Sequence, residues 1–564
     1  MAKTYQIHPA IGIARLGNAT VDIADDGTYY LSPEVPHQVP NEGKSYKVGG
    51  KIKKQGQRFR IFEYENGVPT REITLSASDV EYISWDVQLV NGKAALNSRL
   101  PPAQQRNQQA AYTGNRKYLR IDSKRPDKNN PDATFTNVVG QKSSGSSSKK
   151  SFDTSKKLQG FVRFAKYSGG QISDELDLPG TTVPLGEMYS ETGSGRLIVF
   201  GGNGKSNNPT GIPLGHAVSH AFANNDGWYD DTSDGIITAE IGFKGSTVPV
   251  SQDSGEARII CSVPRYAPAI ESFVTLYDVA KEVYYDPAAS LPTPSFWRDI
   301  YPILLRTSRH QWVSAPADAG HGTGKGGDFA SPGQLKLLMD KSSPTATARR
   351  KMIVSRLRNP NDLNDGDMAI LNGVASLDGK PVVPRSSDAQ VTFNTESFTL
   401  TKLQYAQMEK WAEGDFTVDD ADKYPSSLDD LDIKQQPAAV DRAAMDSCLA
   451  RAFYPGIECC YTVELLESYN SVFRIKESKL AGYLSQGNSL PWQTDYLACS
   501  REWWPSQRPN RVYREIDGNY VPGQAWTEGV SNAPDMLDKW SHLGFIVQEG
   551  MQFVETERDP QLAS

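Results

Sequence analysis

The sequence predicts an α+β fold, with a β-rich N-terminal part followed by a largely helical, loop-rich C-terminal part. Up to about residue 270, short runs of β-forming residues alternate with Gly, Asn and Asp turns. Beyond that point, apolar residues recur every three or four positions, which is the period of an α-helix. A chain of 564 residues is also too long for one small core. We therefore expect a β-rich domain over residues 1–270 and a mostly helical domain over residues 271–564.

The expected strands of the first domain are runs of β-formers bounded by turn residues: Arg58–Tyr64, Val80–Leu89, Arg196–Phe200 and Val248–Val263. Between the second and the third run lies Gln141–Lys157, a polar tract rich in Ser and Lys that has no apolar face. Because such a tract cannot bury enough apolar surface to pack, it predicts a mobile surface loop.

The segment GSGRLIVFGGNGKS ends like a phosphate-binding loop, but its spacing is wrong. Val199 stands where such a loop needs its first glycine, and Ile198 stands where a dinucleotide fingerprint needs its last. The sequence therefore predicts neither type of nucleotide site.

Three aspartates, Asp230, Asp231 and Asp234, carry the oxygen ligands that a hard cation prefers. Ile241, however, stands where a calcium-binding loop needs its terminal Glu, and Asx-turns are the favoured explanation of the cluster. With only seven histidines in the chain, we do not expect a metal enzyme.

Composition and charge limit the compartment and the partners. The net charge is −7 and the isoelectric point is near 5.7, so neither nucleic acid nor an anionic membrane is an expected partner. Five cysteines do not make a disulfide framework in so long a chain. The N-terminus lacks the pattern of a signal peptide, and no stretch is apolar enough to span a membrane. We expect a soluble cytoplasmic protein, with release from the cell left open.

The second domain contains three segments with helical spacing of apolar residues. Two are Pro294–Val313 and Thr401–Gly414, the latter with a glycine stop. In the third, Pro534–Val547, three apolar residues share one helical face: Met536, Trp540 and Leu543. Gly544 is the expected stop of this helix.

The stretch Ser489–Asn510 concentrates three of the ten tryptophans and one of the five cysteines: Trp492, Trp503, Trp504 and Cys499. Asp495 precedes Cys499 by four residues, so the two side chains would share a face if the segment is helical. Judged by residue type alone, such an aromatic cluster is more often core than chemistry. A carboxylate near a thiol and several indoles nevertheless suits a reaction between thiol and indole.

Six blocks of sequence, in this order, resemble one family. They are IHPAIGIARLGN, FWRDIYPILLRTSRHQWV, PGIE at 455–458, LPWQTDYLAC, WWPSQRP, and W-x-x-LGF at 540–545. The chain resembles the bacterial quinoprotein amino-acid oxidases of the L-lysine 6-oxidase and glycine oxidase type. The blocks run from residue 7 to about residue 545, so the resemblance covers nearly the whole chain.

The resemblance implies a protein-derived cofactor, cysteine tryptophylquinone. The family's cofactor cysteine follows an aspartate of the PWQ-x-D block by four residues, which points to Cys499 and Asp495. Its tryptophan lies well downstream, and Trp540 in the W-x-x-LGF block is the expected partner. The alternatives are Trp526, Trp503 and Trp504. Asp495 is expected to act as the base, both in cofactor formation and in turnover.

The resemblance also implies the reaction and the substrate pocket. A primary amine of the substrate attacks the quinone carbonyl, a base removes a proton from the amine-bearing carbon, and the cofactor takes up the electrons. The products are an aldehyde or an oxo acid, ammonia and, after reoxidation by dioxygen, hydrogen peroxide. Expected pocket residues are Tyr454, Trp228, Tyr229 and Cys448. A plain turn-packing role for Tyr454 remains an equal alternative.

The ε-amine of L-lysine is the expected substrate. Oxidation of glycine or of another L-amino acid at the α-amine is the alternative within the family. A non-catalytic scaffold relative is the alternative outside it, and an amine dehydrogenase is less expected because the chain has no CxxCH haem site. The resemblance further implies a separate flavoprotein for cofactor maturation, and a homodimer or homotetramer.

Overall fold

The computed structural model describes most of the chain, in pieces separated by gaps. Described are residues 3–93, 134–140, 155–162, 167–168, 171–172, 181–209, 211, 214, 225, 228–250, 255–357, 359–361, 400–450, 457–459, 461–498 and 505–563. Of the tract predicted to be a mobile loop, residues 141–154 lie outside the described residues, and the last three residues begin a strand.

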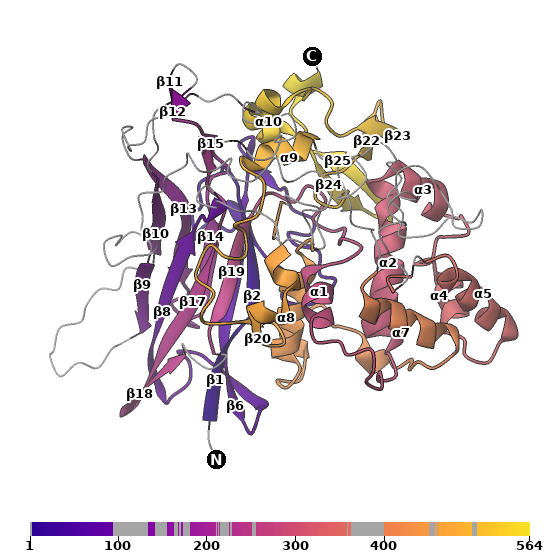
Figure 1. Cartoon of the computed structure of the whole chain (residues 1–564), viewed down its shortest axis with the longest axis horizontal. Coiled ribbons are helices and arrows are strands. Elements are labelled where there is room, and N and C mark those ends of the chain that lie inside the picture. The colour runs from indigo at the N-terminus through magenta and orange to yellow at the C-terminus, as the bar shows by residue number, and fades with distance from the viewer. Residues whose placement is uncertain are drawn as a thin grey trace.

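One large sheet dominates the N-terminal half (Figure 1). Its strands run in the order β10-β13-β14-β6-β2-β19-β17-β8-β9, with β1, β3 and β7 paired to β6 and β18 paired to β17. Pairing is antiparallel except between β2 and β19 and between β3 and β6. The bounds are β1 Lys3–His8, β2 Ile11–Arg15, β3 Tyr29–Leu31, β6 Lys54–Glu65, β7 Val68–Ile73, β8 Val80–Val90, β9 Thr134–Gly140, β10 Ser155–Val162, β13 Thr181–Ser190, β14 Leu197–Gly201, β17 Ser233–Phe243, β18 Ser246–Val250 and β19 Ala257–Ser262.

The core of this half lies between two parts of the same curved sheet. Buried side chains of β13 and β14, such as Met188 and Val199, belong to one cluster with Trp85 of β8 and Ile237 of β17. Strand β8 alternates between buried and half-buried residues along its second half, as a strand with one face on a core does. The strands expected at Arg58–Tyr64, Val80–Leu89 and Arg196–Phe200 are all present.

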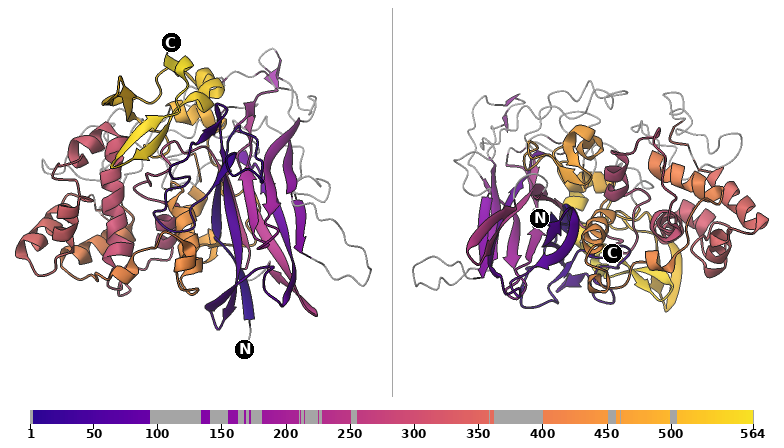
Figure 2. Two further views of the ribbon diagram at one scale, coloured as in Figure 1. Left: turned by 180° about the vertical axis from the view of Figure 1, so that it is seen from behind. Right: turned by 90° about the horizontal axis from the view of Figure 1, so that it is seen from below.

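Helices gather in the C-terminal half, on one side of the large sheet (Figure 2). They are α1 Leu276–Glu282, α2 Tyr301–Arg309, α3 Ala315–His321, α4 Pro332–Met339, α5 Pro344–Val354, α7 Lys402–Ala412, α8 Gln436–Asp446, α9 Trp492–Ala498 and α10 Ala533–Lys539. A π-helical turn, Phe296–Ile300, leads into α2, so the expected helix at Pro294–Val313 is present. After α7, Gly414 takes a φ of 89°, which confirms the expected glycine stop.

A buried ion pair joins the two halves. Arg15 of β2 pairs with Glu458 of the PGIE block, and both side chains are almost fully buried. Arg306 of α2 pairs with Asp278 of α1 at 2.7 Å and with Asp446 of α8 at 2.8 Å. Arg306 and both of its partners lie beyond residue 270, so of these pairs only Arg15–Glu458 joins the two halves.

A small second sheet lies near the C-terminus, in the order β23-β22-β25-β24. Its strands are β22 Arg511–Ile516, β23 Asn519–Ala525, β24 Phe545–Glu549 and β25 Gln552–Thr556. The helix expected over Pro534–Val547 ends earlier than predicted, because α10 stops at Lys539, a 3₁₀ turn spans Trp540–His542, and β24 starts at Phe545. Gly544 allows the chain to approach β25, since a Cβ there would lie 2.5 Å from Cγ of Glu555.

The observed architecture confirms the predicted α+β class: a β-rich N-terminal half precedes a half with more helix and more loop. Within the described residues, no helix combines the length and the apolar character needed to cross a membrane.

Candidate active site

Trp540 lies where α10 ends, inside a hydrophobic cluster that also contains Trp492, Tyr266 and Trp526. Its side chain is 6% exposed. The ring stands at 74° to the ring of Trp492, with centroids 5.3 Å apart. The backbone carbonyl of Trp540 accepts a 2.6 Å hydrogen bond from the hydroxyl of buried Tyr266. Both the ring and the backbone of Trp540 are therefore held in place.

A glycine lies against the benzo ring of Trp540. Gly204 has a φ of 76°, and a Cβ built on it would lie 2.3 Å from Cζ2 and 2.5 Å from Cη2 of the indole. Such distances are far inside van der Waals contact, so the indole occupies a cradle that any side chain at this position would fill. Gly204 belongs to the loop between β14, which ends at Gly201, and β15 (Ser206–Asn207).

Helix α9 starts at a carboxylate from the N-terminal half. The backbone N–H of Trp492 donates to Oδ2 of Asp230 over 3.1 Å, and the same oxygen pairs with the ammonium of Lys93 at 2.5 Å. Both charged side chains are buried. Asp230 also accepts a 2.9 Å bond from the hydroxyl of Thr232, two residues on, which is the local turn that the sequence predicts.

The loop between β14 and β15 that contains Gly204, called the glycine loop below, also binds a second aspartate, Asp231. The N–H of Asn203 donates to its Oδ2 over 2.6 Å, while its Oδ1 has no hydrogen-bond partner among the described residues. Burial, together with the nearby Asp230, raises the pKa of Asp231 to about 7 against the lowering effect of hydrogen bonds from the loop N–H groups. This carboxyl group therefore titrates near neutral pH.

Asp495 lies in α9, between the buried residues Trp492 and Tyr496, and Cys499 follows the helix directly in the sequence. Helix α9 and helix α10 lie side by side at one end of the large sheet (Figures 1 and 2). The side chain of Asp495 and four further predicted site residues lie outside the described part of the structure: Cys499, Trp503, Trp504 and Tyr454.

Three other predicted residues have defined places. Trp526 is fully buried, donates from Nε1 to the carbonyl of Gly544 over 3.0 Å and packs on Tyr266. Trp228 and Tyr229 are half-buried against the core of the large sheet. Tyr229 belongs to β16 (Tyr229–Asp230), which pairs with β15, and it directly precedes Asp230, the residue that accepts from the first N–H of α9.

Cys448 belongs to a different hydrophobic cluster from Trp540, around α1 and the end of α8. Its thiol is buried and lies beside that of Cys459, and burial raises the pKa of Cys448 well above its ordinary value. Cys459 donates to the carbonyl of Leu449 over 3.2 Å. The structure does not bring Cys448 into the cluster of aromatic residues around Trp540.

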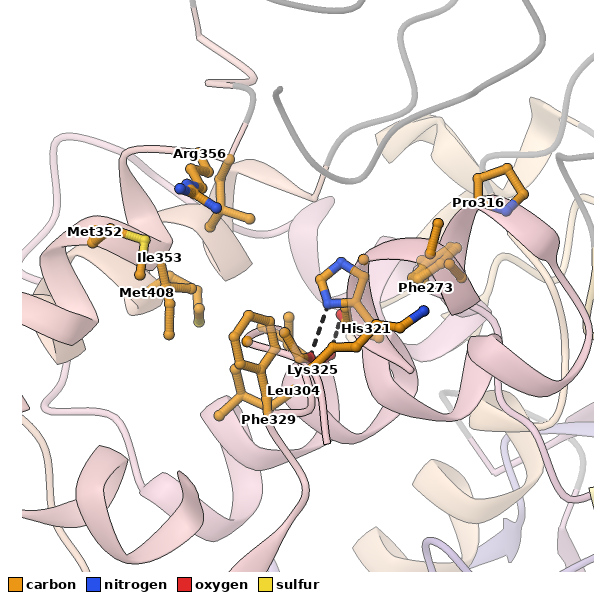
Figure 3. Close-up of a pocket in the computed structure, with 18 of the residues that line it drawn as sticks. Phe273, Leu304, Pro316, His321, Lys325, Phe329, Met352, Ile353, Arg356 and Met408 are labelled. Carbon is orange, nitrogen blue, oxygen red and sulfur yellow. Dashed lines mark hydrogen bonds between the residues drawn. The ribbon is translucent and has the colours of Figure 1, made fainter. Parts of the chain in front are cut away.

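A separate cavity of about 630 Å³ lies between α2, α3, α5 and α7 (Figure 3). Its walls are mostly apolar, and four basic side chains reach it: His321, Lys325, Arg349 and Arg356. The ring of Phe329 belongs to one apolar cluster with Leu304 of α2 and Ile353 of α5, and Nδ1 of His321 contacts the carbonyl of Gly327 at 2.9 Å. None of its lining residues is a predicted site residue, and sequence reasoning did not anticipate it.

Sequence comparison identifies the family of the chain. Residues 8–254 match the sequence model described as L-lysine epsilon oxidase N-terminal, and residues 384–526 match that of the L-lysine epsilon oxidase C-terminal domain. Together these matches span more than half of the chain. The second includes Asp495 and Cys499 and ends before Trp540.

Individual relatives agree with these matches. The chain is 25% identical to L-lysine 6-oxidase of Marinomonas mediterranea over 722 residues, covering 99% of this chain and 90% of the relative. Two crystal structures of the L-Lys epsilon-oxidase from that organism share the fold with a TM-score of 0.69 each. One is its Schiff base intermediate with L-Lys, 20% identical, and the other is 22% identical; each alignment covers 99% of this chain and 95% of the other.

The two sequence matches, which together span more than half of the chain, show that it belongs to the L-lysine ε-oxidase family.

Proposed function

We propose that this protein is a quinoprotein oxidase that oxidatively deaminates a primary amine of an amino acid, with the ε-amine of L-lysine as the preferred substrate. The reaction consumes the amine, dioxygen and water and releases an aldehyde, ammonia and hydrogen peroxide. The proposal of lysine rests on the 25% identity to a lysine oxidase across almost the whole chain.

The placement of Trp540 is the observation that carries the proposal. A buried indole lies in a glycine cradle beside α9, and this helix contains Asp495 and leads directly to Cys499. A quinone made from Cys499 and Trp540 would fit this arrangement, because thiol and indole must come into contact before they can be joined. Trp526 is the weaker candidate, since its Nε1 already donates to Gly544 within the core of the small sheet.

The cofactor would supply an electrophilic carbonyl and accept two electrons from the substrate amine. The residues around it have simpler tasks. Asp495 takes a proton from the amine-bearing carbon, Trp492 and Tyr266 fix the indole plane and backbone, and burial of the cluster excludes water from the reacting atoms.

Peptide mapping of the purified protein tests the cofactor. Formation of the quinone and its thioether adds two oxygen atoms and removes four hydrogen atoms, with dioxygen as oxidant and a flavoprotein as the maturation partner. We expect a Cys499 peptide joined to a Trp540 peptide after co-expression with that flavoprotein, and unmodified chain without it. A co-expressed protein of unmodified mass would contradict the proposal.

Peroxide release tests the substrate. We expect the mature protein to form hydrogen peroxide in air with L-lysine, more slowly with Nε-acetyl-lysine, whose ε-amine is blocked, and more slowly with glycine. Equal rates with lysine and its acetylated form would show that the α-amine is oxidised instead.

A further inference from the structure

The segment GGNGKS lacks the spacing of a phosphate loop, and the structure places its Gly204 against Trp540. Gly204 forms the cradle of the indole, and its φ of 76° is itself a conformation that side chains rarely adopt. The loop comes from the large sheet, whereas Trp540 comes from the C-terminal helix α10. The contact thus sets the position of the ring from outside its own element.

Gln493 ties this loop to α9. Its Nε2 donates to the carbonyl of Gly204 over 3.1 Å, and its Oε1 accepts from the hydroxyl of Ser206 over 2.7 Å. The side chain is 1% exposed, so both bonds are shielded from water. Gln493 lies on the same short helix as Asp495 and two positions before it.

Loop, helix and indole therefore form one interlocked unit. The loop fixes the ring through Gly204 and fixes the helix through Gln493, and Asn203 anchors the loop to buried Asp231, which lies between β16 and β17. A covalent bond between a thiol and a ring carbon needs an approach closer than van der Waals contact, so a displacement of about 1 Å would slow it by orders of magnitude.

We propose that Gly204 and Gln493 are positioning residues for cofactor formation: together they hold the indole of Trp540 in register with the helix that leads to Cys499. The inference rests on the proposed function, because it concerns the joining of these two side chains. It requires no contact between either residue and the substrate.

The first experiment compares Gly204→Ala with Gly245→Ala. Gly245 has a similar φ of 84°, but no atom of the described residues lies within 4 Å of its added Cβ. Both variants carry the strain of an Ala with positive φ, whereas only Gly204→Ala pushes on Trp540. After co-expression with the flavoprotein, peptide mapping should find the cross-link in Gly245→Ala and lose at least nine-tenths of it in Gly204→Ala.

The second variant, Gln493→Met, keeps the volume of the side chain and removes both hydrogen bonds, so it adds no clash. We expect a folded protein, by circular dichroism and thermal melting, with at least a tenfold lower cross-linked fraction. It also decides the case if Gly204→Ala fails to fold. Ser206→Ala, which removes one of the two hydrogen bonds and leaves the one to Gly204, should retain most of the cross-link.

The outcomes separate the two hypotheses. Cross-linked wild-type protein together with fully cross-linked Gly204→Ala or Gln493→Met variants would overturn the positioning role and leave the proposed function standing. Wild-type protein that stays unmodified with its maturation partner would overturn both.

Discussion

At the residue scale, the position of one indole depends on three residues that lie far apart in the sequence. Gly204 contacts the benzo ring of Trp540, Trp492 packs edge-on against it, and Tyr266 binds its carbonyl. The sequence predicts Trp540 and Trp492 because they lie in recognisable blocks. It does not predict Gly204, because a glycine's role depends on what approaches it, and the approaching side chain is distant in sequence.

Cys499→Ala should abolish the cross-link and the oxidase activity while the protein stays folded, since one thiol contributes little packing. Mass spectrometry and thermal melting measure the two effects. Cys261→Ala is the matched control, because Cys261 is a fully buried thiol in the core of the large sheet. A fully active Cys499→Ala variant would end the proposal for this residue.

Asp495→Ala should give little or no mature cofactor, because the base that accepts protons during its formation is lost. The visible absorption of the quinone after co-expression measures this. A normal spectrum would remove Asp495 from that role. Asp538→Ala, a carboxylate of the neighbouring helix α10 that the proposal does not use, should leave the spectrum unchanged.

Asp231 predicts a dependence of stability on pH. Its pKa in the folded protein is raised to about 7 from its ordinary value near 3.8, so the folded state binds the proton more tightly than the unfolded state, and stability falls as the pH rises from about 4 to about 7. Asp231→Asn removes this loss of stability, because an amide side chain does not titrate. We expect the melting temperature of the variant, relative to wild type, to be higher at pH 8 than at pH 5.

Asp340→Asn is the control for Asp231. Hydrogen bonds from Ser342 hold the pKa of Asp340 below its ordinary value, so Asp340 stays ionised throughout this range. The difference in melting temperature between Asp340→Asn and wild type should be the same at pH 5 and at pH 8. A flat difference for Asp231→Asn would contradict the assigned titration.

At the element scale, α9 is a helix of seven residues that tertiary contacts hold in place. So short a helix is unstable by itself, and here Asp230 binds its first N–H while Gln493 binds the glycine loop. The longer helices α2 and α7 are predicted from apolar spacing and caps, and the strands β6, β8 and β14 from runs of β-formers. The early end of α10 is not predicted from the sequence, because it depends on the pairing of β24 with β25, which no local pattern reveals.

Asp230→Ala should destabilise the protein by about 3–5 kcal/mol, because it leaves the buried ammonium of Lys93 without its carboxylate and the start of α9 without its acceptor. Chemical denaturation measures this. The control is Asp420→Ala, which breaks an ion pair with Lys423 whose aspartate side chain is 81% exposed, and it should cost less than about 1 kcal/mol. Equal losses would contradict the anchoring role.

At the scale of the whole molecule, the two halves share buried charges as well as apolar clusters. Arg15 comes from the first sequence block and Glu458 from the third, and their ion pair lies between the large sheet and the helical half. The resemblance of the blocks predicts that both residues matter. Their pairing is visible only in three dimensions, because the residues are remote in sequence.

Glu458→Gln should lower the free energy of unfolding by about 3–5 kcal/mol, since it leaves buried Arg15 without a counter-charge. The whole chain should still unfold in a single transition. Calorimetry would test this. Lys44→Gln, which removes an exposed ion pair with Asp26, is the control and should change the transition little. Two separate transitions in the wild-type protein would show that the halves unfold independently.

The position of Trp540 at the end of α10, and of Cys499 just after α9, has a consequence for the denatured chain. The proposed bond between them would close a covalent ring of about 40 residues, and this tether would restrict the unfolded ensemble as a disulfide does, by about 4 kcal/mol. Heating a mixed preparation would then precipitate the precursor first. The protein that stays soluble after heating would be the cross-linked protein. Because the cross-link forms only where folding has brought thiol and indole into contact, its presence would identify the molecules that folded correctly.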